Sequence, residues 1–410
     1  MIKKILYLSY DGLTDPLGES QILPYILGIS SIKDSKIQIV SVEKKERFNI
    51  KSQEIKKILA TKNIDWTPLI FSSRFGIISK IWDLFKLIFV GLKIVIFSKI
   101  EILHARGHPS AQIGYYLKKY FSYKSKLIFD YRGLWAEERV DKGGWDLENY
   151  FHMIQYKYYK KLEKRILSAS DRVIVLTRKM ANELYRNYEV RPEIITVIPC
   201  CADGELFKIR QESLALNKRI ELGIDKDAVV FGYLGSVGSM YCMDRFFALV
   251  NIANDQGINA FGLIVSNDID LTKKIKFKFT KEKYLNKVII VQSQRSEIPT
   301  LIQIFDVNVI FLKTSYVRLG TCPTKFAETL MCGVPNVANK GIGDMDKQIQ
   351  DKNLGMVIDN CEDESLDKVI ANLNFLKDLK GLKVRESALE FLDLGLANKL
   401  YNKVYRELLS

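Results

Sequence analysis

The sequence has few of the side chains that bind transition metals. Its 410 residues include three histidines and six cysteines, and no two cysteines have the two-residue spacing of a zinc site. Scattered cysteines without such pairs fit a reducing compartment, so we expect a cytoplasmic protein. The N-terminal residues also lack a long apolar segment followed by a small-residue cleavage site, and we expect no signal peptide.

Acidic residues are comparatively scarce in the first half of the chain. Residues 1–205 contain 34 lysines and arginines against 23 aspartates and glutamates, whereas residues 206–410 contain 28 against 25. Such asymmetry indicates an anionic partner, and nucleic acid, an anionic membrane surface or a phosphate-bearing substrate would each fit. A generally lysine-rich composition would give the same excess without any partner.

The length and composition predict two folded domains. A chain of 410 residues is too long for one compact core, and its 47% apolar residues suffice to fill two. In the first half, short apolar segments alternate with helical ones, which predicts a parallel sheet covered by helices. Strands are expected at Ile5–Ser9, Ile37–Val42, Glu101–His104, Leu127–Asp130, Arg172–Leu176 and Ile194–Ile198, and helices around residues 20–31, 77–98, 109–120, 150–168 and 178–188.

A second series of the same kind begins after a turn-rich connection near residue 205. Its strands are expected at 229–235, 261–265, 287–291, 306–312, 334–338 and 355–358. We therefore predict one Rossmann-like domain over residues 1–205 and another over residues 206–383. Apolar residues at helical spacing predict further helices over residues 384–410, which we expect to fold back onto the first domain.

The segment 77–98 is long and strongly apolar. Its charged residues, Lys80, Asp83, Lys86 and Lys93, fall on one arc of a helix and leave a broad apolar face. These charges argue against a helix that spans a membrane. Two interpretations stay open: the apolar face packs in the core of the first domain, or it lies in a membrane interface.

The most informative segment is 321–335, with the sequence Thr-Cys-Pro-Thr-Lys-Phe-Ala-Glu-Thr-Leu-Met-Cys-Gly-Val-Pro. Pro323 fits the first turn of a helix, where its missing N–H costs nothing. Thr324 and Lys325 then lie at the positive end of the helix dipole, which attracts an anion. Glu328 lies four residues after Thr324, on the same face. A helix start that attracts phosphate, one turn from a carboxylate, indicates a nucleotide-sugar site.

Two further features of the second half are expected at the same sheet edge. The segment 233–240 follows the first strand and contains Gly235 and Gly238, so its backbone N–H groups can hold a pyrophosphate. Four basic residues would neutralise the charge that develops on a departing diphosphate, and they are Arg295, Lys313, Arg318 and Lys325.

In the first half, polar segments follow three strands. The segment 9–21 joins the first strand to the first helix, where doubly wound sheets bind ligands, and its Gly18 lets the backbone approach a ligand closely. His108 and Arg132 follow two later strands, and their strand ends are expected beside each other.

Together, these segments resemble the family-4 glycosyltransferases, which have the GT-B fold. The resemblance covers nearly the whole chain, with further landmarks at residues 11–24, 170–177, 197–207 and 233–238. It implies an α/β protein with two Rossmann-like, doubly wound domains facing a central cleft. The donor would bind mainly to the second domain and the acceptor mainly to the first.

The same resemblance implies roles for individual residues. Glu328 would bind ribose hydroxyls, Thr324 and Lys325 would hold the diphosphate, and Gly18 and Gly235 would let the backbone close around the donor. Members transfer sugar with retention of configuration and generally need no metal, so a nucleotide-diphosphate sugar would be the co-substrate, without a metal or other cofactor.

The sequence departs from the family pattern at two positions. Gly320 stands eight residues before Glu328, where many members have the first of two glutamates, which contacts the sugar. Ser236 stands where many members have an arginine after the loop glycine. We expect the basic set of Arg295, Lys313, Arg318 and Lys325 to compensate for that second difference. His108 and Arg132 are the candidate catalytic residues of the first domain.

We therefore expect a retaining hexosyl- or N-acetylhexosaminyltransferase of cell-surface polysaccharide biosynthesis. Its acceptor would be a glycan or a lipid-linked sugar, and it would work in the cytoplasm, in peripheral contact with an anionic membrane. One alternative is a GT-B-like nucleotide-sugar epimerase that uses Asp130, Glu137 and Glu138 for proton chemistry. Another is a basic nucleic-acid-binding protein, but the positive residues are not interleaved with a nucleic-acid motif, and we expect no nucleic-acid partner.

Overall fold

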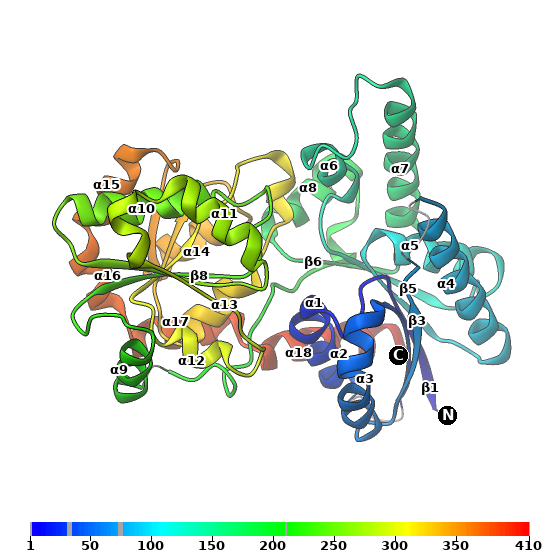
Figure 1. Cartoon of the computed structure of the whole chain (residues 1–410). Coiled ribbons are helices and arrows are strands. Elements are labelled where there is room, and N and C mark those ends of the chain that lie inside the picture. The colour runs from blue at the N-terminus through cyan, green and yellow to red at the C-terminus, as the bar shows by residue number, and fades with distance from the viewer. Residues whose placement is uncertain (1, 31–34, 73–76, 210, 410) are drawn as a thin grey trace. The chain divides into compact units, whose positions relative to one another are not determined.

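The computed structural model describes residues 2–30, 35–72, 77–209 and 211–409, with the side chains of Ile77, Ile78 and Lys80 left out. These residues form two compact units, one of Met1–Pro199 with Leu394–Ser410 and the other of Cys200–Asp393 (Figure 1). The divisions thus lie after residues 199 and 393, where the sequence suggested 205 and 383. The last helix but one therefore belongs to the second unit.

The first unit contains a seven-stranded sheet in which every neighbouring pair is parallel. This arrangement confirms the doubly wound architecture that the alternation of strands and helices predicts. In spatial order the strands are β3 (Ile64–Ile70), β2 (Ser35–Glu43), β1 (Lys3–Ser9), β4 (Ile102–Arg106), β5 (Lys126–Tyr131), β6 (Arg172–Val175) and β7 (Ile195–Val197).

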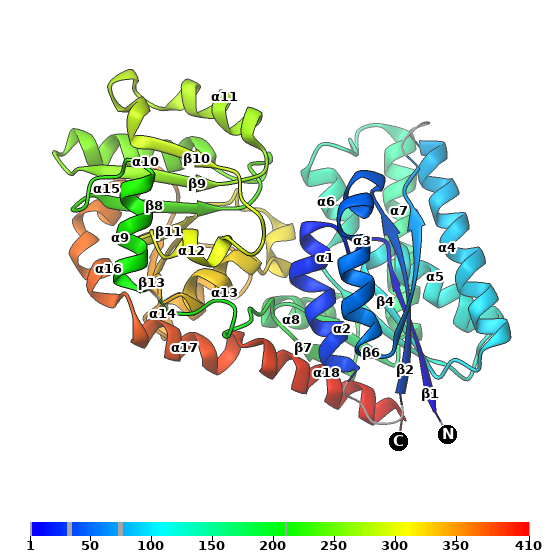
Figure 2. The same cartoon turned by 60° about the horizontal axis from the view of Figure 1, so that its bottom comes forward.

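Helices cover both faces of this sheet. On one face lie α1 (Pro16–Gln21), α2 (Leu23–Ile29), α3 (Lys45–Ala60) and α18 (Leu394–Leu409) (Figure 2). On the other face lie α4 (Ile77–Phe97), α5 (Gly107–Tyr120) and α7 (Tyr150–Ala169). The remaining elements are α6 (Trp135–Asp141), α8 (Arg178–Tyr188) and the short 3-10 helix Pro192–Ile194.

The C-terminal helix α18 packs along α2 of the first unit (Figure 2). It buries Ala397, Tyr401, Val404 and Tyr405 at helical spacing. The Tyr405 hydroxyl lies 2.6 Å from Nδ1 of His104, so the last helix is tied to the end of β4.

The edge strand β3 and the helix α3 are absent from the sequence-based prediction. β3 contains Pro68, which cannot donate a hydrogen bond, and most of its side chains are only half-buried. An edge strand tolerates both features because it pairs on one side only. The helix α3 buries only Ser52, Ile55 and Leu59, so its apolar periodicity is weak.

The helix α4 buries only part of its apolar face, namely Leu87, Ile94 and Val95. Asp83 is completely buried, where its carboxylate accepts the backbone N–H of Ser72 and pairs with Lys86 at 2.6 Å. Side chains such as Phe85 and Phe89 are exposed instead. Pairing makes the buried carboxylate tolerable, so Asp83 and Lys86 face inward, whereas Lys93 of the same arc is exposed. No helix in the described ranges is long and apolar enough to cross a membrane.

The second unit contains a six-stranded parallel sheet. In spatial order its strands are β10 (Val288–Val291), β9 (Ala260–Val265), β8 (Val229–Leu234), β11 (Val307–Ile310), β12 (Asn336–Asn339) and β13 (Gly355–Ile358). Every residue of the four central strands is buried, as expected for a parallel sheet covered on both faces.

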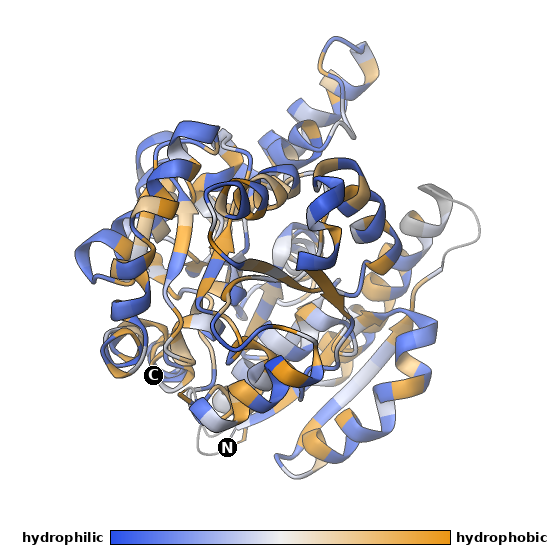
Figure 3. Ribbon diagram, turned by 60° about the vertical axis from the view of Figure 1, so that its left-hand side comes forward, coloured by the Kyte–Doolittle hydropathy of each residue, from blue (hydrophilic) through white to orange (hydrophobic). Residues whose placement is uncertain are grey.

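Nine helices accompany the described part of this sheet. Hydrophobic and hydrophilic residues alternate along many helical ribbons of the molecule (Figure 3), as expected for helices that cover a sheet. The nine helices are α9 (Glu212–Glu221), α10 (Met243–Asp255), α11 (Ile269–Phe279), α12 (Ile298–Ile302), α13 (Thr324–Met331), α14 (Met345–Asp351), α15 (Asp363–Ala371), α16 (Leu373–Leu379) and α17 (Leu382–Leu392). Two 3-10 helices, Glu282–Lys287 and Tyr316–Gly320, complete the unit.

Gly18 has a structural role within the first unit. It lies in α1, and a Cβ added there would stand 2.0 Å from the carbonyl oxygen of Gly12 and 2.7 Å from Leu13. The helix can approach the loop after β1 this closely only because residue 18 lacks a side chain.

We therefore expect Gly18→Ala to lower the free energy of unfolding by about 2 kcal/mol or more, because backbone atoms cannot move aside cheaply. Calorimetry of the purified chain would measure this as a lower melting temperature. Gly238→Ala is the matched control, since a Cβ at Gly238 meets nothing within 4 Å. Equal melting temperatures for wild type and Gly18→Ala would contradict the packing argument.

Candidate functional site

Two loops meet at the carboxyl edge of the second sheet. The loop that follows β8 is bonded to the end of β11: the N–H of Cys242 donates to Phe311 at 3.0 Å, and the N–H of Lys313 donates to Met240 at 2.9 Å. These bonds bring the glycine loop at 235–238 beside the residues that lead to α13. The sequence-based expectation that these segments share one sheet edge is therefore met.

Lys325, in the first turn of α13, is the central residue of this edge. Its side chain is buried, and its ammonium nitrogen lies over the rings of Tyr233 and Tyr241, 4.2 Å and 4.3 Å from their centroids. Within the described part of the chain, Lys325 Nζ has no hydrogen-bond partner. A buried ammonium group with three unused donors is suited to an anionic ligand.

The surroundings of Lys325 lower the pKa of its ammonium group to about 7. Burial is the main cause, because it penalises the charged form, and the nearby carboxylate of Glu328 opposes it. The two aromatic ring faces also favour the cation and offset part of the burial penalty. Burial raises the pKa of both Tyr233 and Tyr241, so these rings stay neutral.

Gly235 is required beside this lysine for two reasons. Its φ of 113° lies in the region that L side chains rarely adopt, and a Cβ there would stand 3.3 Å from Lys325 Nζ. The next residue, Ser236, has an exposed side chain, while its carbonyl accepts the hydroxyl of Tyr233 at 2.5 Å. The loop thus presents backbone to the space next to the ammonium group.

Glu328 lies one turn further along α13 and is also buried. Its Oε1 pairs with Nη1 of Arg295 at 2.5 Å, and the Arg295 guanidinium lies 5.0 Å from the ring centroid of Phe207. Among the described residues, this pair leaves Oε2 of Glu328 available to accept hydroxyl groups.

The other predicted residues of the second unit differ in exposure. Thr324 begins α13 and is half-buried, Arg318 is buried, and Lys313 is exposed. The Arg318 Nε–H donates to the carbonyl of Lys313 at 3.2 Å, and the Arg318 carbonyl accepts the N–H of Gly343 at 2.8 Å. Arg318 therefore fastens the segment between β11 and α13, whereas the Lys313 ammonium reaches solvent.

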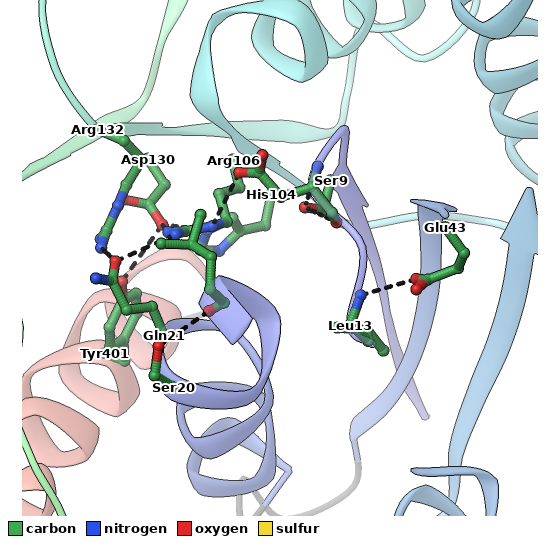
Figure 4. Close-up of polar contacts among 12 residues, drawn as sticks. Ser9, Leu13, Ser20, Gln21, Glu43, His104, Arg106, Asp130, Arg132 and Tyr401 are labelled. Carbon is green, nitrogen blue, oxygen red and sulfur yellow. Dashed lines mark hydrogen bonds and ion pairs between the residues drawn. The ribbon is translucent and has the colours of Figure 1, made fainter. Parts of the chain in front are cut away.

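In the first unit, Asp130 at the end of β5 gathers the polar side chains of the sheet edge (Figure 4). Its carboxylate contacts Arg132 at 3.3 Å, Arg106 at 3.5 Å and His104 at 3.6 Å. Burial alone would raise the pKa of Asp130, but Arg132, His104 and Arg106 together hold it well below its usual value. Arg132 also donates to Oε1 of Gln21 at 2.7 Å.

Glu43, at the end of β2, fixes the loop after β1 (Figure 4). Its carboxylate is buried and accepts the backbone N–H groups of Leu13 and Thr14 at 2.8 Å and 3.0 Å. This contact holds the start of the segment that contains Gly18. Sequence reasoning missed Glu43 because a lone glutamate at a strand end resembles a solvent-exposed residue.

His108 lies apart from the Asp130 group, in a cavity of about 50 Å³ between α4, α5, α6 and α7. Its Nε2 is 2.6 Å from Glu163, and Trp135 and Tyr159 line the same cavity. Burial alone would raise the pKa of Glu163, but the contacts with His108 and Lys160 lower it to about 2.

Comparison with known families now identifies the chain. Residues 57–206 match Glycosyltransferase Family 4, and residues 216–380 match the group 1 glycosyl transferases. The chain is a family-4 type GT-B glycosyltransferase. The resemblance inferred from the segment 323–335 is thereby confirmed.

Solved structures show the same fold as this glycosyltransferase. Anabaena Alr3699/HepE with UDP and glucose matches with a TM-score of 0.71 at 14% identity, over 99% of this chain and 100% of the other. A glycosyltransferase from Rickettsia africae ESF-5 gives 0.70 at 15%, over 100% and 99%. WaaG, a glycosyltransferase involved in lipopolysaccharide biosynthesis, gives 0.64 at 13%, over 98% and 99%. No curated protein sequence matches the chain significantly.

Sequence reasoning missed three aromatic residues of this candidate site. Tyr233 and Tyr241 enclose the Lys325 ammonium, and Phe207 lies against Arg295. Their positions next to the glycine loop and the inter-domain connection could have signalled them. Aromatic residues at such positions usually fill a core, so the sequence alone does not separate the two roles.

The lowered pKa of Lys325 predicts a pH-dependent stability difference. Between pH 7 and 10 the unfolded chain binds more protons at this residue than the folded chain, so the contribution of Lys325 to stability rises with pH. Without ligand, Lys325→Met should therefore be more stable than wild type near pH 7, by about 1 kcal/mol or more, and the gain should shrink towards pH 10.

Calorimetry at pH 7 and at more alkaline pH would measure this difference. Lys347→Met, which alters an exposed lysine, is the control and should change stability little at either pH. A Lys325→Met variant that is less stable than wild type at pH 7 would show that the ammonium group is satisfied without a ligand.

Proposed function

We propose that this glycosyltransferase moves a sugar from a nucleotide-diphosphate sugar to a glycan or lipid-linked acceptor, with retention of configuration. The observation that supports this most strongly is the Lys325 ammonium, which is buried, has no hydrogen-bond partner among the described residues, and lies beside Gly235 at the start of α13. A diphosphate would supply the missing anionic partner and would also accept backbone N–H groups of the helix start.

The second half of the donor site is Glu328. Its free oxygen, Oε2, can accept the ribose hydroxyls while Arg295 holds the other oxygen. Solved structures of Anabaena Alr3699/HepE contain UDP and UDP-glucose, and on this basis we propose a uridine nucleotide as the first donor to test.

Catalysis in this proposal is mainly electrostatic and positional. As the bond between the anomeric carbon and the diphosphate oxygen breaks, negative charge grows on the diphosphate. The acceptor hydroxyl oxygen forms the new bond to the anomeric carbon, and its proton passes to the departing diphosphate oxygen. Lys325, Arg318 and Lys313 would stabilise that charge, with Thr324 at the helix start. In the first unit, Arg132 and His108 would position the acceptor.

This arrangement of charge also leads us to propose that the transfer needs no metal ion. Protein cations and helix N–H groups would take the role of a divalent ion on the diphosphate. We expect the rate of sugar transfer to stay within about twofold after treatment with EDTA. Loss of activity with EDTA and recovery with Mg²⁺ or Mn²⁺ would contradict this part of the proposal.

We further propose a cytoplasmic role in cell-surface polysaccharide assembly, at the membrane that carries the acceptor. Support comes from the excess positive charge of the first half and from the structural likeness to WaaG, which is involved in lipopolysaccharide biosynthesis. Hexosyl or N-acetylhexosaminyl groups are the transferred sugars that we propose to test first.

A thermal-shift panel of UDP-, GDP- and ADP-sugars would test donor binding. We expect one nucleotide series to raise the melting temperature of wild type by a few degrees at saturating ligand, because ligands stabilise the state that binds them. Glu328→Ala should lose most of this shift, because it removes the acceptor of the ribose hydroxyls. Glu364→Ala, on the exposed start of α15, is the matched control and should retain the shift.

Four outcomes would count against the proposal. If no nucleotide sugar stabilises wild type, donor binding is refuted. If Glu328→Ala keeps the full shift, its assigned role is wrong. Conversion of the donor sugar without any acceptor would indicate the epimerase instead, and an inverted anomeric configuration in the product would refute retention.

A further inference from the structure

We infer that the helices α4, α5 and α7 form a docking surface for an anionic membrane, which we name the basic apolar face. This inference deepens the membrane-proximal part of the proposed function by naming the surface that makes the contact. Its first component is the outward side of α4, where exposed fractions reach 60% for Trp82, 70% for Phe89 and 79% for Phe97. The exposed apolar residues of this helix are Ile81, Trp82, Phe85, Ile88, Phe89, Ile96 and Phe97.

This side of α4 cannot turn inward without breaking buried polar contacts. Asp83 is held by the backbone N–H of Ser72 and by Lys86, which itself donates to the carbonyl of Ile70 at 2.5 Å. Rotation of the helix would leave the buried carboxylate unpaired, which is strongly unfavourable. The buried contacts of Asp83 and Lys86 therefore hold the exposed apolar side chains outward.

The apolar surface continues onto the neighbouring helices. α5 lies between α4 and α7 and contacts both (Figure 1). Tyr116 of α5 interacts with Tyr158 of α7 and stacks on Tyr120 with centroids 6.2 Å apart. The exposed aromatic and aliphatic residues on or next to these two helices are Tyr120, Phe121, Tyr123, Tyr150, Phe151, Ile154 and Tyr158.

All exposed charges on the described residues of these three helices are positive. Their only acidic residues are Asp83 and Glu163, and both are buried in ion pairs. The exposed charged residues are Lys93, Lys119, Lys157, Lys161, Lys164 and Arg165. A face of this sign attracts anionic lipid headgroups, because each basic residue near the membrane surface adds to the attraction.

The composition favours a membrane over a protein partner. Protein interfaces are depleted in lysine and enriched in arginine, but five of these six exposed basic residues are lysines. Trp82 and several tyrosines supply the amphipathic rings that are enriched at membrane–water interfaces. Because α4 is too short or too charged to span a bilayer, the contact would be peripheral, with the apolar rings entering the headgroup boundary.

Flotation of the full-length protein with lipid vesicles would test the inference. We expect binding to phosphatidylcholine vesicles that contain about one-third phosphatidylglycerol, and much weaker binding to pure phosphatidylcholine. Phe85→Ser/Phe89→Ser should lower the partition coefficient on the order of tenfold at both low and high salt. Lys119→Gln/Lys157→Gln should lower the partition coefficient mainly at low salt. At high salt, screening already weakens the attraction between the wild-type lysines and the lipid headgroups, so their removal changes little.

The matched control is Ile50→Ser/Phe277→Ser, which removes two exposed apolar side chains that lie outside the basic apolar face. It should keep the wild-type partition coefficient within about twofold. The inference is overturned if wild type binds neither vesicle, or if this control loses binding as much as the Phe85/Phe89 variant. It is also overturned if wild type self-associates in solution and only the Phe85/Phe89 variant becomes monomeric, because the face would then join two copies.

Each protein variant that is tested with vesicles would also be tested in the nucleotide-sugar thermal-shift assay. A retained donor shift shows that the second unit is folded, and an unchanged far-UV circular dichroism spectrum and melting temperature would show that the first unit, which carries the face, is folded as well. A loss of flotation then reports on the face itself. Flotation of a wild type that binds no nucleotide sugar would leave the membrane surface standing and would refute only the proposed transfer.

Discussion

The arrangement of the proposed donor site depends on one buried charge. Lys325 places its ammonium group between two neutral tyrosine rings, where burial lowers its pKa to about 7. Such a shift corresponds to a cost on the order of several kcal/mol for charging the group in the empty site. An anion that enters the site removes this cost, so its binding energy is concentrated where the leaving diphosphate develops charge.

The neighbouring features are consistent with this constraint. Gly235 leaves the space next to the ammonium group open, and a side chain at that position would occupy it. The pair between Arg295 and Glu328 keeps a second cation and the hydroxyl acceptor close by without bringing the carboxylate into direct contact with Lys325. In the proposed site, the charge for the phosphate and the acceptors for the ribose hydroxyls are thus held separately on one short helix.

Much of the fold could be predicted from the sequence because parallel sheets bury apolar strands between amphipathic helices, and both periodicities are visible. The segment 323–335 could be placed because its proline, its basic residue and its acidic residue have fixed spacing on a helix. Features that depend on contacts between distant parts of the chain could not be predicted. The strand β3 carries Pro68, Glu43 binds a loop 30 residues away in sequence, and Tyr241 meets Lys325 only in the folded unit.

The helix α4 shows why periodicity gives the faces of a helix but not their direction. Its charged arc and its apolar face are both evident in the sequence, and a core position for the apolar face is the ordinary outcome. The deciding contacts come from Ser72 and Ile70, which lie before the helix and satisfy Asp83 and Lys86. Because Asp83 and Lys86 find their partners on the inner side of the helix, the aromatic side chains on the opposite side lie at the surface. An apolar surface whose exposed charges are all positive is suited to an anionic lipid membrane.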